Sequence, residues 1–332
     1  MGRPCAVVTV SAAESEQLGS IARSQRAFRP CEMSRLSPAS QSVVVNRRSP
    51  EKATKLLKVV AFNAKGGCHL EGIRQCLTRP PLAQANVILV CDADWCLPRS
   101  RFRKVAAELA ASLEMSFAYV PKRQAIEPGS YSGNAILSSQ PLVDVVAVPL
   151  SKPQLISPEP DRVGEPYGMM ATTVYNGSRI TFGVTHLTAR WNPAGRERQM
   201  ADFIAALPAD GPVLIGGDFN TTTIDLGGRN ALLRALSEIV LNPGRFRSPE
   251  LYEPLLQQLK KEGFEVRGFN VRRKPTFTFA RVIPSFLRPK LDWLAARQLS
   301  PVPGSALVVP ARLSVFSRRV SDHDFVMCEV QL

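Results

Sequence analysis

A carboxylate and a carboxamide follow a short apolar run in the second half of this 332-residue sequence. Asp218 and Asn220 come after residues 212–215 and the dipeptide Gly216-Gly217. The apolar run is typical of a buried strand, and the glycines allow a tight turn. Because residues two apart in an extended segment point the same way, Asp218 and Asn220 can face one substrate. The alternative is a turn in which both side chains cap their own backbone.

Polar side chains of the same kinds stand at the ends of other predicted strands, most of them directly after an apolar run. They are Asn63, Asp92, Asp94, His186, Asp292, Asp322 and His323. Their convergence at one edge of a sheet would suit metal-assisted hydrolysis of a phosphoester. The cation takes oxygen ligands and draws charge from the phosphoryl oxygens, while a carboxylate or an imidazole activates water. Taken singly, each residue also has a structural interpretation, as a turn former, a carboxylate near a helix start or a packed core histidine.

The elements that must position these residues are mostly strands. Apolar runs predict strands at 55–63, 85–91, 116–120, 133–138, 142–150, 169–175, 180–185, 212–215, 289–295 and 325–330. Helices are predicted at 68–77, 103–113, 196–207 and 251–262. The dipeptide Asn176-Gly177 predicts a hairpin between two of the strands. Together these elements predict an α+β fold, with two mainly antiparallel sheets packed face to face and helices outside.

The composition bounds the class of protein. The formal net charge is +14 and most of it lies beyond residue 55, which favours anionic partners, nucleic acid among them. The alternative is that the charge serves only solubility. Seven cysteines without a CxxC pair predict reduced thiols and argue against zinc. No apolar run is long enough to span a membrane, and no signal peptide is recognisable, so we expect a cytoplasmic monomer.

Residues 1–52 differ from the rest of the chain. They are rich in Ser, Arg, Ala and Pro and lack sustained periodicity. This pattern predicts a disordered basic extension, followed by one domain over residues 53–332.

Seven segments carry a resemblance to a known family. They are VVAFNA, NVILVCDADW, GNAILSSQPL, GVTHLTAR, PVLIGGDFNTTT, KLDWLAA and VSDHDFVMCEV. In this order they resemble the endonuclease/exonuclease/phosphatase superfamily, which includes DNase I-like nucleases, inositol polyphosphate 5-phosphatases and bacterial sphingomyelinases. The resemblance covers about residues 56–332 and implies a four-layer α/β sandwich with Mg²⁺ as the usual cofactor and Mn²⁺ as an alternative.

The resemblance also implies catalytic roles for five residues. Asp218 would orient or deprotonate the attacking water, and Asn220 would contact the transition state. His186 would donate to a non-bridging phosphate oxygen. His323, paired with Asp292, would act as the base or as a phosphate-stabilising imidazole, since a carboxylate partner fixes the tautomer of an imidazole.

The remaining implied roles concern the metal. Asn63 would hold the acidic metal ligand and the scissile phosphate, and Asp322 would be a metal or orienting carboxylate. The family normally places Gln-Glu at the end of its second strand, where the Glu binds Mg²⁺. This sequence has Cys91-Asp92 there. Asp92 keeps the charge on a shorter side chain, and Asp94 could share the metal.

The function that these residues imply is a divalent-metal-dependent phosphoesterase acting on a phosphodiester. The basic body favours nucleic acid as the substrate. The alternatives are a phospholipid or sphingomyelin-type phosphodiesterase, a small-molecule phosphatase, or a non-catalytic phosphate-binding module in which Asp92 fails to hold the metal. Arg162 is followed two residues later by Gly164, a pattern typical of the subgroup of this superfamily that the sequence resembles. We therefore predict a substrate-binding role for Arg162, with a solvated loop charge as the alternative.

Overall fold

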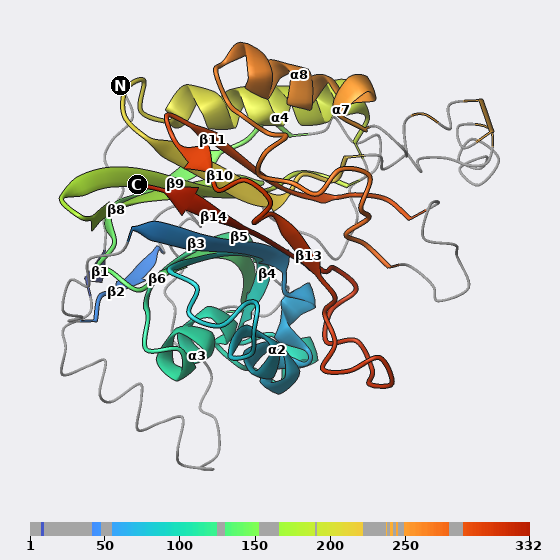
Figure 1. Ribbon diagram of the computed structural model, residues 1–332. Coiled ribbons are helices and arrows are strands. Elements are labelled where there is room, and N and C mark those ends of the chain that lie inside the picture. Colours follow the sequence, from blue (N-terminus) through green and yellow to red (C-terminus); the bar gives the residue numbers. More distant parts are fainter. Residues whose placement is uncertain are drawn as a thin grey trace, which may run out of the picture.

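The computed structural model describes residues 8–9, 42–47, 55–124, 130–152, 166–189, 191–221, 249–278 and 288–332, with residues 237, 240, 241 and 244. In this part of the chain two sheets pack face to face, and helices cover the outer face of each (Figure 1). The layers run helix, sheet, sheet, helix. The predicted four-layer α+β sandwich is therefore confirmed.

The larger sheet has nine strands. They are β1 (Val8–Thr9), β2 (Val43–Val45), β3 (Leu56–Asn63), β4 (Val87–Trp95), β5 (Ser116–Gln124), β6 (Tyr131–Ser138), β12 (Ser300–Pro301), β13 (Leu307–Val309) and β14 (Phe325–Gln331). Their order is β1-β2-β5-β6-β4-β3-β14-β12, and β13 also pairs with β14. Most neighbours are antiparallel, but β3 and β4 are parallel. The carboxyl ends of β3 and β4 therefore meet at one edge of the sheet.

The smaller sheet has five strands in the order β11-β10-β9-β8-β7. They are β7 (Val143–Pro149), β8 (Tyr167–Tyr175), β9 (Ser178–His186), β10 (Val213–Asp218) and β11 (Asp292–Arg297). The predicted Asn-Gly hairpin joins β8 to β9. Strand β10 is parallel to β9 and antiparallel to β11, in a register that places its last residue beside the last residue of β9 and the first of β11.

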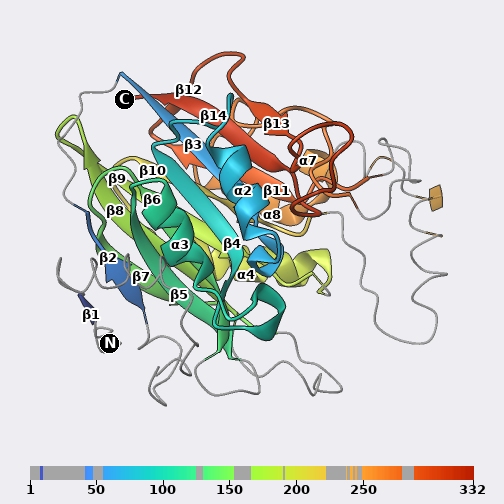
Figure 2. The same cartoon turned by 90° about the horizontal axis from the view of Figure 1, so that it is seen from below.

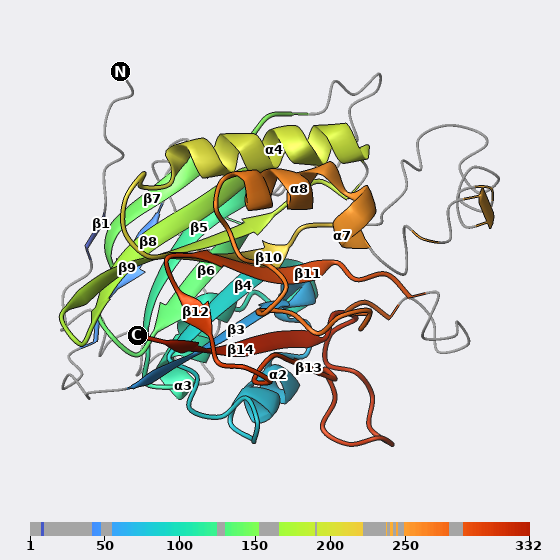
Figure 3. The same cartoon turned by 45° about the horizontal axis from the view of Figure 1, so that its top comes forward.

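The helices lie outside both sheets. They are α2 (Leu70–Leu77), α3 (Val105–Ser112), α4 (Pro193–Ala206), α7 (Pro249–Tyr252) and α8 (Pro254–Lys261), with short 3₁₀ turns η2 (Lys65–Gly67) and η3 (Pro98–Ser100). Figure 2 shows α2 and α3 against the nine-stranded sheet, and Figure 3 shows α4 and α8 across the five-stranded sheet.

Strand β3 shows how one sequence run serves two cores. Val59 and Ala61 pack between the two sheets, whereas Val60 and Phe62 pack toward α2 and α3. Successive side chains on a strand point to opposite faces, so a strand covered on both faces reads as a continuous apolar run. This continuity makes residues 55–63 recognisable as a strand from the sequence.

The elements differ from the predictions at several boundaries, and the structure adds short strands that were not predicted, among them β12 and β13. Strand β4 continues to Trp95, beyond the predicted end at residue 91. Helix α4 begins at Pro193, three residues early, because the Asn192 side chain accepts a hydrogen bond from the Gly195 amide and caps the helix. Val43–Val45, inside the predicted disordered extension, pairs with β5. Most of residues 1–52 lies outside the described residues, and disorder there stays a prediction.

The described cysteines and helices bear on two further expectations. Five cysteines are described, and all are free thiols. Cys5 and Cys31 lie outside the described residues. Within the described part of the chain, every helix is too short or too polar to cross a bilayer.

Candidate active site

The ends of β3 and β10 bring two predicted site residues into contact across the two sheets. The Asn63 side chain, buried at the end of β3, donates from Nδ2 to Asp218 Oδ2 at 3.0 Å. Its Oδ1 accepts the Lys65 amide at 2.8 Å, which fixes the orientation of the carboxamide. The Asn63 carbonyl accepts the Ser321 hydroxyl. Asn63 therefore joins the two sheets at the edge where the polar strand ends meet.

The register of the five-stranded sheet brings two more of these residues beside Asp218. Asp218 is paired with His186 on β9 and with Asp292 on β11. Gly217 makes this approach feasible: its φ is 132°, and a Cβ there would lie 2.3 Å from the Thr185 carbonyl oxygen. A side chain at this position would push β10 away from β9.

Asp218 is the centre of the site. Its Oδ2 lies 3.3 Å from His186 Nε2 and 3.7 Å from His323 Nε2, in addition to its bond from Asn63. Its Oδ1 accepts the backbone amide of Asn220 at 3.1 Å. Asn220 is itself held by a bond from Nδ2 to the Leu187 carbonyl. One buried carboxylate thus connects four of the residues predicted from the sequence.

Asp292 and His323 form a buried pair next to Asp218. His323 Nδ1 lies 2.8 Å from Asp292 Oδ2, and the ring packs edge-on against Phe277. Burial alone would lower the pKa of His323, but the Asp292 and Asp218 carboxylates raise it well above its ordinary value. One donor atom from each of Asp218, Asp292 and His323 lies within 4.8 Å of the others.

A bulge in β4 directs Asp92 to the site. Cys91 and Asp92 together oppose the single residue Asn134 of β6, and Asp92 has a φ of 49°. Asp92 Oδ1 lies 3.2 Å from His186 Nδ1, so the imidazole sits between the Asp92 and Asp218 carboxylates. Bulges commonly re-aim a side chain beside an active site. Here the bulge explains why β4 runs past the predicted end of the strand.

The Asp92 carboxylate is ionised and accessible. Burial acts to raise its pKa, but His186, Lys122 and Arg99 hold that pKa well below its usual range. Its side chain is 26% exposed, and Oδ2 makes no hydrogen bond with the described residues. A hard cation prefers such oxygen ligands. Asp92 therefore offers one carboxylate oxygen to the divalent metal that the sequence predicts, and the cluster of Asp218, Asp292 and His323 is a second place where donor atoms lie close together.

Asp94 and Asp322 have other partners. Asp94 is fully buried, and both of its oxygens accept hydrogen bonds from Arg99. Asp322 pairs with Lys65 at 2.9 Å on the rim of the site. The structure thus brings neither carboxylate into the cluster around Asp218. Arg162 lies outside the described residues.

Three residues of the site region were not singled out from the sequence. The Cys91 thiol donates to the Thr185 carbonyl and accepts the Asp218 amide, so it links the sheets. Lys122 is buried at a bulge of β5, and its charge helps to lower the pKa of Asp92. Arg99 binds Asp94. Lys122 lies beyond the predicted strand 116–120, and only the structure extends β5 over it.

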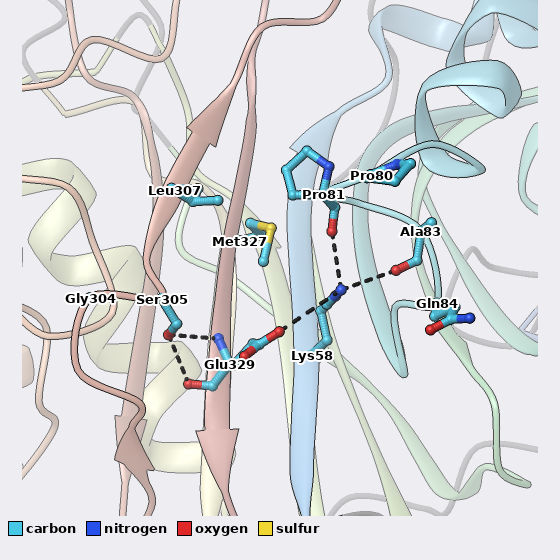
Figure 4. Close-up of a pocket in the computed structure, with 10 residues that line it drawn as sticks. All are labelled: Lys58, Pro80, Pro81, Ala83, Gln84, Gly304, Ser305, Leu307, Met327 and Glu329. Atoms are coloured by element: carbon cyan, nitrogen blue, oxygen red, sulfur yellow. Dashed lines mark hydrogen bonds and ion pairs between the residues drawn. The ribbon is translucent and has the colours of Figure 1, made fainter.

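A surface pocket lies away from these residues. Its volume is about 390 Å³, and its lining includes Lys58, Pro81 and Met327 (Figure 4). Lys58 Nζ donates to the carbonyls of Pro81 and Ala83, so its charge is already engaged. Lys58 precedes Asn63 by five residues, about 16 Å along an extended strand. The pocket is therefore separate from the polar cluster.

Solved structures share this fold at low sequence identity. An endonuclease/exonuclease/phosphatase from Beutenbergia cavernae DSM 12333 is 17% identical, with a TM-score of 0.58 over 84% of this chain and 72% of that one. The human Nocturnin catalytic domain with bound sulfate is 16% identical, with a TM-score of 0.54 over 90% and 99%. D. rerio TDP2 complexed with single strand DNA product is 13% identical, with a TM-score of 0.50 over 84% and 100%.

The sequence itself gives the family. Residues 95–323 match the model of the Endonuclease/Exonuclease/phosphatase family, and the chain belongs to this family. No curated protein sequence matches the chain. The resemblance carried by the seven segments is therefore confirmed.

Proposed function

We propose that this protein is a divalent-metal-dependent phosphoesterase that hydrolyses a phosphodiester bond by in-line attack of water. The observation that carries the proposal is the environment of Asp218. Its Oδ2 has nitrogen atoms of Asn63, His186 and His323 at 3.0, 3.3 and 3.7 Å. A buried carboxylate oriented in this way suits the activation of a water molecule beside a phosphate.

Asp92 would hold the metal, with Mg²⁺ as the expected ion and Mn²⁺ as the alternative. Asp218, bound by Asn63, lies across the His186 imidazole from Asp92. A cation bound at Asp92 would draw charge from the phosphoryl oxygens. Asp94 is not included among the ligands, because Arg99 engages both of its oxygens.

The side chains divide the remaining work. Asp218 orients the water and takes its proton as the new P–O bond forms and the bond to the leaving oxygen breaks. His323 stays protonated beside Asp292 and donates to a phosphoryl oxygen, which favours the phosphate-stabilising role over the role of base. His186 donates to a non-bridging oxygen, and Asn220 contacts the transition state.

Two comparisons and the charge support a phosphodiester substrate. Nocturnin binds sulfate and TDP2 binds a single-stranded DNA product in the solved structures of the same fold. The net charge of +14 favours an anionic polymer. Nucleic acid is therefore the proposed substrate class.

Turnover of bis-p-nitrophenyl phosphate tests the mechanism. EDTA should abolish turnover and added Mg²⁺ or Mn²⁺ should restore it. Asp218→Ala should lower kcat by about 10²-fold or more. Asp144→Ala is the matched control, because Asp144 is an exposed carboxylate paired with Arg179 on the far hairpin. Turnover that survives both EDTA and Asp218→Ala would contradict the proposal.

A second candidate is a phospholipid phosphodiesterase, and an exposed turn favours it. Phe316 is 95% exposed and Val315 is 67% exposed at the tip of a turn closed by hydrogen bonds between Ser314 and Ser317. Arg318 follows the turn directly. An apolar tip beside basic residues suits an anionic membrane surface.

Hydrolysis of sphingomyelin in vesicles containing phosphatidylserine distinguishes this candidate. If lipid is the substrate, Phe316→Ser should reduce vesicle hydrolysis strongly and leave turnover of bis-p-nitrophenyl phosphate unchanged. Equal turnover of vesicles by the wild type and Phe316→Ser, or no lipid hydrolysis at all, would exclude it.

A further inference from the structure

Asp94 and Arg99 form an ion pair whose two ends differ in exposure. Arg99 donates from Nε to Asp94 Oδ2 at 2.7 Å and from Nη2 to Oδ1 at 2.6 Å. The Asp94 side chain is 0% exposed, and the Arg99 side chain is 48% exposed. Two parallel charge-assisted bonds fix the plane of a guanidinium. The negative end of the pair is therefore buried and the positive end reaches solvent in a fixed orientation.

The turn η2, which follows Asn63, closes over this ion pair. Gly66 has a φ of 71°, and a Cβ there would lie 2.6 Å from Arg99 Nε and 2.7 Å from Asp94 Oδ2. The backbone at Gly66 therefore packs directly on the bonded atoms. This contact holds the guanidinium against the same loop that carries the site residue Asn63.

A serine hydroxyl connects the ion pair to the proposed metal ligand. Ser132 Oγ lies 3.4 Å from Arg99 Nη2 and 3.4 Å from Asp92 Oδ1. Arg99 is thus one hydroxyl group away from Asp92. Its Nη1 makes no hydrogen bond with the described residues, so this side of the guanidinium has donors for a ligand.

We propose that Arg99, anchored by Asp94, binds a second phosphate of the substrate, next to the scissile ester. The inference rests on the proposed function and names its substrate class: a diester with a neighbouring phosphate. The fork of donors on a guanidinium matches phosphate oxygens. The second phosphate is either an internal phosphodiester of a nucleic-acid strand or a terminal phosphate monoester of a nucleotide.

A pair of substrates that differ by one phosphate tests this assignment. They are the p-nitrophenyl ester of thymidine 5′-phosphate and the same ester with a 3′-phosphate. In the wild type, kcat/KM for the 3′-phosphorylated ester should exceed that of the plain ester by about tenfold, the size of one charge-assisted contact. A third ester with a 3′-methylphosphate separates the sources, because it mimics an internal strand phosphate. The better of the two phosphorylated esters identifies the source.

Two variants keep the test independent of folding. Arg99→Lys keeps the charge but loses the two parallel bonds, so it should reduce the tenfold preference only in part. The double variant Asp94→Asn with Arg99→Gln keeps a hydrogen-bonded pair without charge and should remove the preference. Arg74→Gln is the matched control, because Arg74 is an exposed arginine paired with Glu71 on α2. That variant should keep the preference.

The failures of the two proposals are distinguishable. If the wild type hydrolyses none of the esters with metal present, the proposed function fails. Calorimetric binding of thymidine 3′,5′-bisphosphate and thymidine 5′-phosphate then tests Arg99 without turnover. In the wild type, the bisphosphate should bind about tenfold tighter than the monophosphate. In the double variant, the two ligands should bind with equal affinity. Equal affinities of the wild type for the two thymidine ligands would overturn the assignment of Arg99. So would losses of kcat/KM of equal size on all three esters in both Arg99 variants.

Discussion

Asp292 and Asp94 are both fully buried, and each is paired with a cation, yet their surroundings differ. The partner of Asp292 is the buried imidazole of His323, which also faces Asp218. The partner of Asp94 is the half-exposed guanidinium of Arg99, which reaches Ser132 and the rim of the site. One pair lies at the centre of the proposed chemistry, and the other lies beside it.

The difference teaches that the partner decides what a buried carboxylate can do. An imidazole can change its charge near neutral pH, so a carboxylate beside it can shift the pKa of the imidazole. A guanidinium stays charged, so its carboxylate can only hold it in place. Burial raises the pKa of Asp94 despite the bonds from Arg99. Asp94 therefore depends on Arg99 to remain ionised.

The largest expected effect is a loss of kcat on changing Asp292, compared with a much smaller loss on changing Asp94. Asp292→Asn should lower kcat for bis-p-nitrophenyl phosphate by about 10³-fold, because His323 loses the carboxylate that keeps it protonated and oriented. Asp94→Asn should lower kcat much less, because Asp94 contacts Arg99 and not the reacting groups. Steady-state kinetics of both variants check the comparison. Losses of equal size would show that the two pairs share one role.

A third buried ion pair lies away from the site, and we expect it to affect stability without affecting activity. Arg196 on α4 and Glu253, which precedes α8, are both 0% exposed and hydrogen-bonded to each other. Glu253→Gln should reduce the free energy of unfolding by about 3–5 kcal/mol, because an uncompensated charge remains buried. The kcat of the folded protein should not change.

Urea denaturation measures this loss, with an exposed pair as the control. Glu71→Gln removes the partner of Arg74 at the surface and should cost less than about 1 kcal/mol. A small effect at Glu253 would mean that the other contacts of Arg196, among them its hydrogen bond to the Trp191 carbonyl, are enough to hold the guanidinium in place.

The pH dependence of stability should distinguish the imidazole from the guanidinium. The carboxylates raise the pKa of His323 from 6.5 to about 10, against the effect of burial. The folded state therefore binds this proton more tightly, and the stabilisation is full below pH 6.5 and lost as the pH rises through 10. The contribution of His323 to the free energy of unfolding should therefore fall between pH 7 and pH 10. Burial lowers the pKa of Lys290 to about 7, so Lys290 contributes with the opposite sign in this range, and the contribution of His323 is obtained as the difference between the wild type and a His323 variant.

Denaturation curves across this range check the sign. His323→Gln should remove this contribution, so its free energy of unfolding should fall less with pH, or rise more, than that of the wild type. Arg99→Gln should leave the slope as in the wild type, because a guanidinium does not titrate there. An equally steep slope in His323→Gln would contradict the assignment.

The smallest expected effect concerns the metal. Asp92→Glu restores the longer carboxylate that is usual in the family, and it should lower the Mg²⁺ concentration for half-maximal activity severalfold. Titration of activity with Mg²⁺ measures the change. A weaker response to Mg²⁺ would indicate that the bulge at Asp92 already compensates for the shorter side chain.

Much of the site could be predicted because its residues stand at strand ends. Asn63, His186 and Asp218 each close an apolar run, and the runs have the period and length of buried strands. Their position at strand ends and the order of the seven segments let these residues be expected together, and the parallel pairing of β9 with β10 and the packing of the two sheets bring them into contact. The sandwich fold followed from the same runs and from the resemblance of the seven segments.

The sequence by itself determined most of the long strands, the order of the polar residues at their ends and the family. Only the tertiary structure decided that Asp94 forms an ion pair with Arg99 and that Asp322 forms one with Lys65. It also decided that a bulge turns Asp92 toward His186. The physical reason is that hydrophobic periodicity is a local property of the chain. Ion pairs and bulges depend on register and on which elements pack together, and these are fixed only when the whole core forms.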